Sequence, residues 1–188
     1  SWPIMKSRQL VIVILIFCSV FITTKLYSAI GNSTDSLLIQ LNEEKNDTLK
    51  VEILLELAAR TSWTDIAKYE EYARQALELS QNNNYLKGLA YSNYWLAKVF
   101  SEYEIDLSEK LIITALNYAE QINDSILIGM SYQVFGNLKY NVELYHDAKN
   151  YYIKALGIYL RHQQTTFAAG IYNNLGIINN LLASDTSS

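Results

Sequence analysis

The sequence predicts an all-α protein, a solenoid of about three and a half helical hairpins. Three observations predict this fold class. The 188 residues include only 7 Gly and 1 Pro, half of them are hydrophobic, and two separate sequence markers recur at a nearly constant interval. A low Gly and Pro content argues against a loop-rich or disordered chain. Markers that recur with a fixed period are typical of stacked helical repeats.

Both markers place a small residue beside an apolar one. The first consists of Leu57-Ala58, Leu96-Ala97, Phe135-Gly136 and Leu175-Gly176, at intervals of 39, 39 and 40. The second consists of Ala76-Leu77, Ala115-Leu116 and Ala155-Leu156, at intervals of 39 and 40. Because a small side chain lets two helices approach closely, these residues are predicted to mark helix crossings. The predicted crossing residues are Ala58, Ala97, Gly136, Gly176, Ala76, Ala115 and Ala155.

The runs between the markers have apolar residues at helical spacing, as in Val51, Leu54, Leu55 and Ala58. Polar turn signals separate these runs. Asp65, Asp106 and Asp147 are predicted to begin the second helix of each hairpin, where a short carboxylate can accept from exposed backbone N–H groups. A short opening helix is expected from Asp35 to about Glu44. The last run, from about Thr166 to Ala183, is predicted to be the first helix of a fourth hairpin.

Residues 1–29 have the charged, apolar, polar order of a secretory signal. Lys6 and Arg8 precede an apolar run from Leu10 to Ile22, about thirteen residues against the roughly 20 that span a bilayer. A cleaved signal peptide, a retained membrane anchor and a buried core helix are the three alternatives. Residues 1–4 precede Met5 and are set aside as upstream residues. The expected organisation is then a linker and opening helix over 30–46, a repeat domain over 47–183 and a tail over 184–188.

Charge and cysteine content exclude several classes of function. The net charge is −4, and losing Lys6, Arg8 and Lys25 from the 15 basic residues would leave 12 against 19 acidic ones. No basic block is present, so nucleic acid is not an expected partner. Cys18 is the single cysteine, so neither an intrachain disulfide nor a cysteine-rich zinc site is expected.

Residues that could support catalysis are also few. His146 and His162 lie 16 positions apart without metal-ligand spacing and are expected to be surface histidines. The glycines form neither a dinucleotide fingerprint nor a P-loop. We therefore expect no enzymatic activity, no cofactor and no metal.

The third hairpin resembles the tetratricopeptide repeat (TPR), whose pattern joins a W-x2-L-G-x2-Y helix to an A-x3-F helix. The residues that carry the resemblance are Tyr132, Phe135, Gly136, Ala148, Tyr152 and Ala155. The resemblance covers about residues 47–183 and implies a right-handed α-solenoid. Two departures are the missing terminal Pro and a period five or six residues longer than 34. Longer repeats of this kind resemble the exported sensor arrays of Bacteroidota signalling proteins, which implies a periplasmic or membrane-anchored location facing the periplasm.

In the tetratricopeptide family the first helix of each hairpin lines a groove for an extended peptide or a partner helix. The resemblance therefore implies a groove on the corresponding faces here. The candidate groove residues are Tyr91, Tyr94, Lys98, Gln133, Asn137, Tyr140, Asn173, Asn174 and Asn180. The alternative is that these residues only form solvated helix faces. A carboxylate clamp like that of some family members is not favoured, because Gln133 stands where such a clamp has a Lys.

The expected partner is a protein or peptide, with membrane contact only through the N-terminal segment. The first functional hypothesis is an extracytoplasmic sensor module of a longer signal-transduction protein, a histidine kinase or a transcription regulator. The alternative is a free periplasmic or surface scaffold that assembles partner proteins. The last helix is apolar on several sides, so it is expected either to be followed by further chain or to be covered by a partner or a second copy of the chain.

Overall fold

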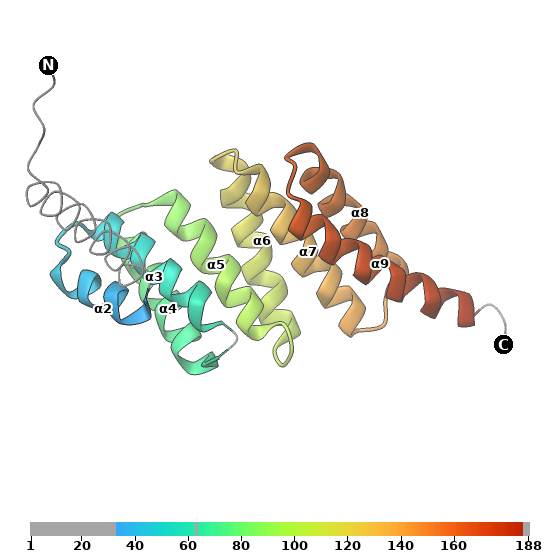
Figure 1. Cartoon of the computed structure of the whole chain (residues 1–188), viewed down its shortest axis with the longest axis horizontal. Helices are drawn as coiled ribbons and strands as arrows, with labels where there is room; N and C mark the ends of the chain where they lie inside the picture. The colour runs from blue at the N-terminus through green and yellow to red at the C-terminus, as the bar shows by residue number, and fades with distance from the viewer. Residues whose placement is uncertain (1–32, 63, 186–188) are drawn as a thin grey trace, which may run out of the picture. The chain divides into compact units, whose positions relative to one another are not determined.

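The computed structural model describes residues 33–62 and 64–185 (Figure 1). These residues contain eight α-helices and no strand, which confirms the predicted all-α class. The helices are α2 (Thr34–Glu43), α3 (Asp47–Thr61), α4 (Ile66–Asn82), α5 (Leu86–Phe100), α6 (Ile105–Gln121), α7 (Ser125–Asn141), α8 (Tyr145–Arg161) and α9 (Thr165–Asp185). Helices lie where they were expected at both edges of the repeat domain, α2 at the opening run and α9 at the last apolar run. The assignment of α9 to a fourth hairpin remains a prediction.

The chain divides into two compact units, Ser1–Glu43 and Glu44–Ser188. Of the first unit the structure describes α2, in which Leu37 is buried and Ile39 is exposed. The predicted signal peptide or anchor over residues 1–29 lies outside the described residues. Among the helices that are described, none combines the length and the apolar character needed to cross a membrane.

In the second unit, helices pack mainly with their neighbours in the chain (Figure 1). The most extensive contacts join α3 to α4, α5 to α6 and α7 to α8, which makes three antiparallel hairpins. Contacts between α4 and α5, α6 and α7, and α8 and α9 join each hairpin to the next helix in the chain. The first helices also touch one another, α3 with α5 and α5 with α7. One side of this unit is therefore built from first helices only.

Six of the seven predicted crossing residues lie at close contacts. Ala58, Ala97, Ala76, Ala115 and Ala155 are all 0% exposed. At Gly136 a Cβ would stand 2.5 Å from the ring of Tyr152 on α8, which is closer than any side chain tolerates. Glycine is needed there because the phenol ring of the partner helix takes the space of a side chain.

Gly176 is different, because no crossing is found at it among the described residues. It is exposed, and no heavy atom lies within 4 Å of the place where its Cβ would stand. The reason is that α9 packs on α8 through its other side, where Ile171 and Ile178 are 0% exposed. The described residues contain no helix after α9 that could lie over Gly176.

The turns between hairpins repeat one backbone geometry. Asn84, Asn123 and Gln163 adopt left-handed φ values of 51°, 55° and 56°. Each is followed by a residue whose N–H bonds back to a helix carbonyl, Tyr85 to Ser80, Asp124 to Ala119 and Gln164 to Tyr159, at 2.8–2.9 Å. These are Schellman motifs, which satisfy the free carbonyls at a helix end. Their intervals of 39 and 40 make them a third marker with the same period as the two in the sequence.

The acidic residues predicted at helix starts occupy two kinds of position. Asp65 is the N-cap of α4 and accepts from the backbone N–H of Lys68 at 3.0 Å. Asp106 and Asp147 lie instead inside the first turns of α6 and α8. There they interact favourably with the positive end of the helix dipole, although they do not cap it. Asp124, at the N-cap of α7, accepts from Leu127 at 2.9 Å.

Candidate functional site

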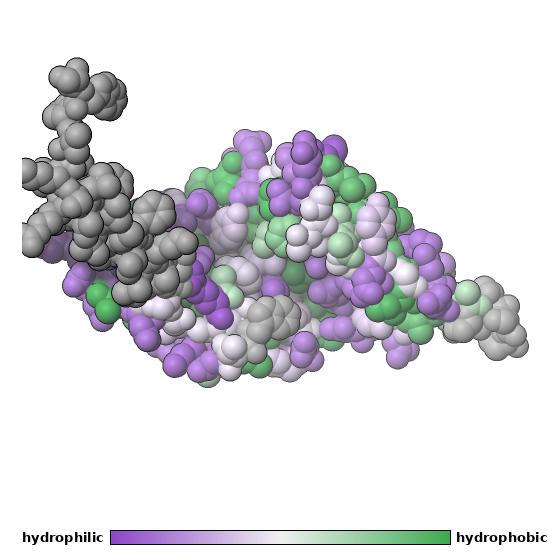
Figure 2. All heavy atoms as spheres, viewed as in Figure 1, coloured by the Kyte–Doolittle hydropathy of each residue, from purple (hydrophilic) through white to green (hydrophobic). Residues whose placement is uncertain are grey.

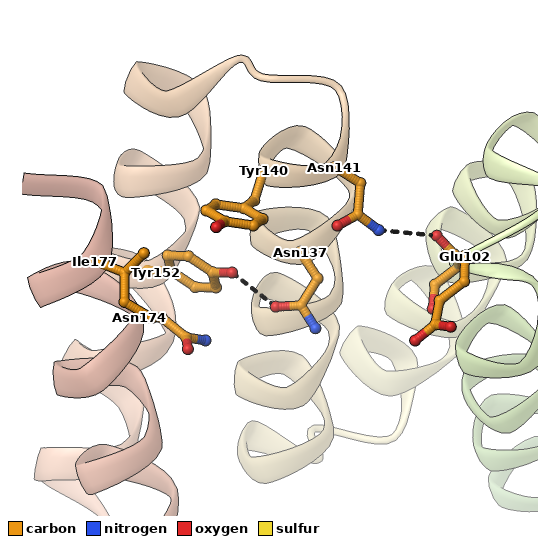
Figure 3. A pocket seen from close by; sticks show the side chains of 8 residues that line it. Glu102, Asn137, Tyr140, Asn141, Tyr152, Asn174 and Ile177 are labelled. Atoms are coloured by element: carbon orange, nitrogen blue, oxygen red, sulfur yellow. Dashed lines mark hydrogen bonds between the residues drawn. The ribbon is translucent and has the colours of Figure 1, made fainter. Parts of the chain in front are cut away.

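Two hollows open on the side of the first helices. The charged hollow, of about 260 Å³, lies between α3 and α5. It is lined by Glu52, Leu55, Glu56, Ala59, Lys87, Tyr91 and Trp95. The amide hollow, of about 290 Å³, lies between the end of α5, α7, α8 and α9. It is lined by Ser101, Glu102, Asn137, Tyr140, Asn141, Tyr152, Asn174 and Ile177 (Figure 3).

The predicted groove residues are divided among three places. Asn137, Tyr140 and Asn174 come together in the amide hollow, and Tyr91 lies in the charged hollow. Lys98, Gln133, Asn173 and Asn180 line neither hollow. Asn173 and Asn180 are exposed on α9. The structure thus brings three of the predicted residues to one small site.

Tyr94 does not belong to a surface groove, and its assignment there is wrong. It is 6% exposed and packs in the core beside Ala90 and Ala97. Its ring meets Trp95 edge-on with ring centroids 4.9 Å apart. Burial raises the pKa of its hydroxyl well above the ordinary value. The sequence could have indicated this burial, because Ala90 and Tyr94 share one helix face with the predicted crossing residue Ala97.

Lys98 and Gln133 are half-buried and engaged within the protein. The Lys98 ammonium lies 5.0 Å from the ring centre of Trp95, and burial lowers its pKa. Gln133 accepts a hydrogen bond from the hydroxyl of Tyr159 at 3.0 Å. Gln133 therefore joins α7 to α8, whereas Lys98 packs on a ring of its own helix.

The hydrogen bonds of the amide hollow centre on Tyr152. Its hydroxyl donates to Oδ1 of Asn137 at 2.7 Å (Figure 3). Burial raises the pKa of Tyr152 to about 12, the nearby Tyr140 acts in the same direction, and the side-chain amide of Asn174 acts against them. A short distance away, Nδ2 of Asn141 donates to the backbone carbonyl of Ser101 at 3.1 Å. Tyr152 is thus a neutral phenol at physiological pH and holds the carboxamide of Asn137.

These bonds fix how the carboxamides are oriented. Because Oδ1 of Asn137 accepts from Tyr152, its two N–H groups remain for a ligand. Asn141 uses an N–H donor within the protein and so presents its Oδ1 acceptor, and the carboxamide of Asn174 lines the same hollow. In Figure 3 the ends of Asn137 and Asn174 point toward the same open space. The amide hollow therefore presents the N–H donors of Asn137 together with carboxamide oxygen acceptors.

The charged hollow is held by ion pairs. The Lys87 ammonium lies 3.0 and 3.2 Å from the two carboxylate oxygens of Glu52, and the Tyr85 hydroxyl also donates to Glu52. Glu56 pairs with Arg60 one turn along α3 at 2.7 Å. Tyr91 donates to the carboxylate of Asp124 at 2.8 Å. The charges and the polar ends in this hollow are therefore already paired.

Metal-binding groups are not assembled in the described part of the chain. No group of three His, Cys, Asp or Glu side chains there could hold a metal ion. His146 and His162 are both exposed, one in the first turn of α8 and the other at its C-cap. The expectations of no cofactor and no enzymatic activity remain predictions.

Several residues of the amide hollow were not predicted from the sequence. Asn141 lies one helical turn after Asn137, and extending the groove face by four residues would have found it. Ser101 and Glu102 come from the α5–α6 turn, whose position beside α7 depends on packing. Tyr152 comes from a second helix and reaches the hollow only because Gly136 leaves space for its ring.

Comparisons of this chain with protein-family models, with curated proteins and with solved structures gave no match. The resemblance to the tetratricopeptide repeat therefore remains a prediction from the residues themselves.

Proposed function

We propose that this protein is an extracytoplasmic module that binds a peptide or an extended segment of a protein. Its architecture would be a right-handed α-solenoid of about three and a half TPR-like hairpins. The crossing residues and the left-handed turns support this because they share one period, and the contacts within each hairpin agree with it. Within such an array the first helices form the binding side.

The observation that carries the proposal is the set of pre-oriented carboxamides in the amide hollow. An extended peptide presents alternating C=O acceptors and N–H donors, since its backbone is not paired within the chain. The N–H groups of Asn137 suit a peptide carbonyl, and the Oδ1 atoms of Asn141 and Asn174 suit peptide N–H groups. Fixing these amides before binding lowers the entropy cost of association.

The size and lining of the hollow also favour a short stretch of peptide. Pockets for cofactors and drug-sized ligands are mostly apolar and have about 300–1,000 Å³. The amide hollow has about 290 Å³, and Ile177 is the only aliphatic residue that lines it. A peptide that passes through the hollow could continue along the neighbouring first helices.

A random dodecapeptide library displayed on phage, selected on the immobilised full chain in detergent, tests this proposal. Selected peptides should lose affinity for the double variant Asn137→Ala, Asn174→Ala. The single variant Asn150→Ala is the matched control, because Asn150 is exposed on α8 and lines neither hollow. Unchanged affinity in the double variant, or a library that yields no binders, would contradict the proposal.

A folding defect must be separated from a binding defect in this test. Asn137→Ala removes the acceptor of the Tyr152 hydroxyl and is expected to cost about 1 kcal/mol of folding free energy. Asn174→Ala alone leaves that bond in place. Thermal melts by circular dichroism should accompany each affinity measurement, so that only folded variants are compared.

We further propose that the module is exported and forms the sensor part of a longer signal-transduction protein. The support is the charged, apolar, polar order of residues 1–29 and the acidic body after them. Fusing residues 1–45 to a reporter enzyme that is active only outside the cytoplasm tests export. Activity that disappears when Leu15 and Ile16 are replaced by Arg would support it, and an inactive wild-type fusion would contradict it.

The alternative is a free scaffold that assembles partner proteins, and α9 favours it. On this helix Tyr172 is 56% exposed and Ile177 is 42% exposed. In Figure 2 apolar side chains gather around the α8 and α9 end of the unit. Exposed apolar groups of this kind are typical of protein contacts. Sedimentation that depends strongly on concentration, and that Tyr172→Lys abolishes, would favour the scaffold.

A further inference from the structure

We propose that the amide hollow binds a cationic group of the peptide, with Glu102 as its counter-charge. The shared chemistry is a cation that carries N–H donors: a lysine or arginine side chain, or a free amino terminus. This inference rests on the proposed peptide-binding function and specifies which peptides the site would select. Its four supporting observations are the charge of the lining, the state of Glu102, the orientation of the amides and the phenol rings.

The charge of the lining is negative and comes from one residue. Glu102 is the only charged side chain among the eight residues of the hollow, and no Lys, Arg or His lines it. The low dielectric of a protein surface hollow strengthens the attraction between a single carboxylate and a cation. A peptide carboxylate would instead be repelled, which agrees with the absence of a carboxylate clamp.

The Glu102 carboxylate is exposed and has no partner within the described residues. No hydrogen bond or ion pair joins it to another group there. By contrast, both glutamates of the charged hollow are engaged, Glu52 by Lys87 and Glu56 by Arg60. The same residue type is therefore paired at one site and left for an outside cation at the other.

The oriented amides add acceptors on the same hollow. Asn141 donates to Ser101 and so presents Oδ1, and the Asn174 carboxamide in the same hollow has an Oδ1 that can turn toward a cation. An ammonium has three N–H donors and a guanidinium five, and neither has an acceptor. Two amide oxygens and one carboxylate can therefore satisfy a cation as it leaves water. The N–H groups of Asn137 remain for a backbone carbonyl beside it.

The phenol rings of the amide hollow also favour a cation. Tyr140 and Tyr152 line the hollow, and the face of a phenol ring attracts a cation within about 6 Å. The protein already uses this contact elsewhere, because the Lys154 ammonium lies 5.1 and 5.3 Å from the ring centres of Tyr151 and Tyr132. An aliphatic side chain of equal length would gain neither this attraction nor the hydrogen bonds.

The peptides selected by phage display on the full chain supply the test. Lys or Arg should be enriched at one peptide position, and Asp and Glu should be depleted there. In a synthetic peptide, replacing that Lys with norleucine should weaken binding at least about tenfold, the usual value of a charge-assisted hydrogen bond. An acetylated and a free amino terminus, compared in the same peptide, show whether the amino terminus is the cation instead.

Glu102→Gln is the decisive variant, because it removes the charge and keeps the shape. Affinity for the lysine peptide should fall about tenfold, and affinity for the norleucine peptide should not change. Glu104→Gln is the matched control, since Glu104 is exposed two residues away, lines neither hollow and makes no side-chain cap bond. It should change affinity less than twofold.

The outcomes separate the two proposals. Selected peptides without an enriched basic residue or a required amino terminus would overturn the cation inference and leave peptide binding intact. An equal loss of affinity in Glu102→Gln and Glu104→Gln would also overturn it, because only general electrostatic attraction would then remain. A library that yields no binders would overturn both proposals.

Discussion

The charged hollow and the amide hollow lie on the same side of the protein and have similar volumes, but their polar groups are used differently. In the charged hollow Glu52, Glu56 and Tyr91 all have partners inside the protein. In the amide hollow Tyr152 orients the Asn137 carboxamide and Ser101 orients that of Asn141, and the remaining donors and acceptors of both have no partner among the described residues. The difference indicates that the paired charges of the charged hollow stabilise the fold, while the amide hollow has hydrogen-bonding groups that remain for a ligand.

The largest expected effect is a loss of stability at alkaline pH, to which Tyr85 beside the charged hollow and Tyr152 in the amide hollow both contribute. The pKa values of Tyr85 and Tyr152 are both raised to about 12. Between their unfolded value of about 10 and this value, the folded state keeps protons that the unfolded state has lost. The free energy of unfolding should therefore be fully present below pH 10 and fall from pH 10 to pH 12.

The causes of the two shifts can be separated by measurement. Tyr85 has burial and the Glu52 carboxylate, whereas Tyr152 has mainly burial. Glu52→Gln should lower the pKa of Tyr85 and leave that of Tyr152 unchanged, as followed by tyrosinate absorbance or NMR. A shift of both tyrosines would show that the hollows are not independent.

The next effect concerns the glycine that admits Tyr152 to the amide hollow. Gly136→Ala should destabilise the protein by about 1–3 kcal/mol, because the new Cβ would overlap the Tyr152 ring. Gly176→Ala is the matched control and should stabilise by about 0.5–1 kcal/mol, since Ala has the higher helix propensity and meets no atom. Chemical denaturation measures both. Equal effects would mean that the α7–α8 contact is looser than described.

A smaller effect is expected when the hydroxyl of a buried tyrosine near each hollow is removed. The hydroxyl of Tyr69, whose ring packs edge-on against Trp95, is buried and has no partner in the described part of the chain. Tyr69→Phe should therefore be neutral or stabilise by up to about 1 kcal/mol. Tyr152→Phe should destabilise by about 1 kcal/mol and weaken peptide binding, because Asn137 loses its donor. Calorimetric melts of both variants would reveal a reversed order.

The smallest effect is that of the ion pair in the charged hollow. A double-mutant cycle with Lys87→Met and Glu52→Gln should give a coupling of about 0.2–1 kcal/mol, because both side chains are partly exposed. The coupling should decrease further in 1 M salt. A much larger value would show that this hollow, too, is organised by charge for binding.

Helices and crossings could be predicted from the sequence because they depend on local spacing. Apolar residues three and four apart define a helix face, and Ala97 or Ala115 needs only a neighbouring helix to be buried. Gly176 shows the limit of this reasoning. The same local pattern marks a crossing only where a second helix lies over it, and none does so here among the described residues.

The candidate site could be predicted only in part. Asn137, Tyr140 and Asn174 were found because a first-helix face can be read from the sequence. Glu102 was missed because a turn joins the site only through the packing of α5 against α7. Tyr94 was misplaced because its polar hydroxyl suggested a surface position, although its neighbours Ala90 and Ala97 are buried. The orientation of each amide depends on residues from other helices.

The repeated left-handed turn divides the protein into interchangeable blocks. Residues 85–123 are bounded by Asn84 on one side and end with Asn123, and both asparagines have the same φ within a few degrees. Excision of that block would join Asn84 to Asp124 and recreate a turn of the same geometry, with Asp124 still capping α7. Duplication of the block would add a hairpin in the same way. The length of the array, and with it the number of hollows on the first helices, can thus change through gene rearrangement without a new junction.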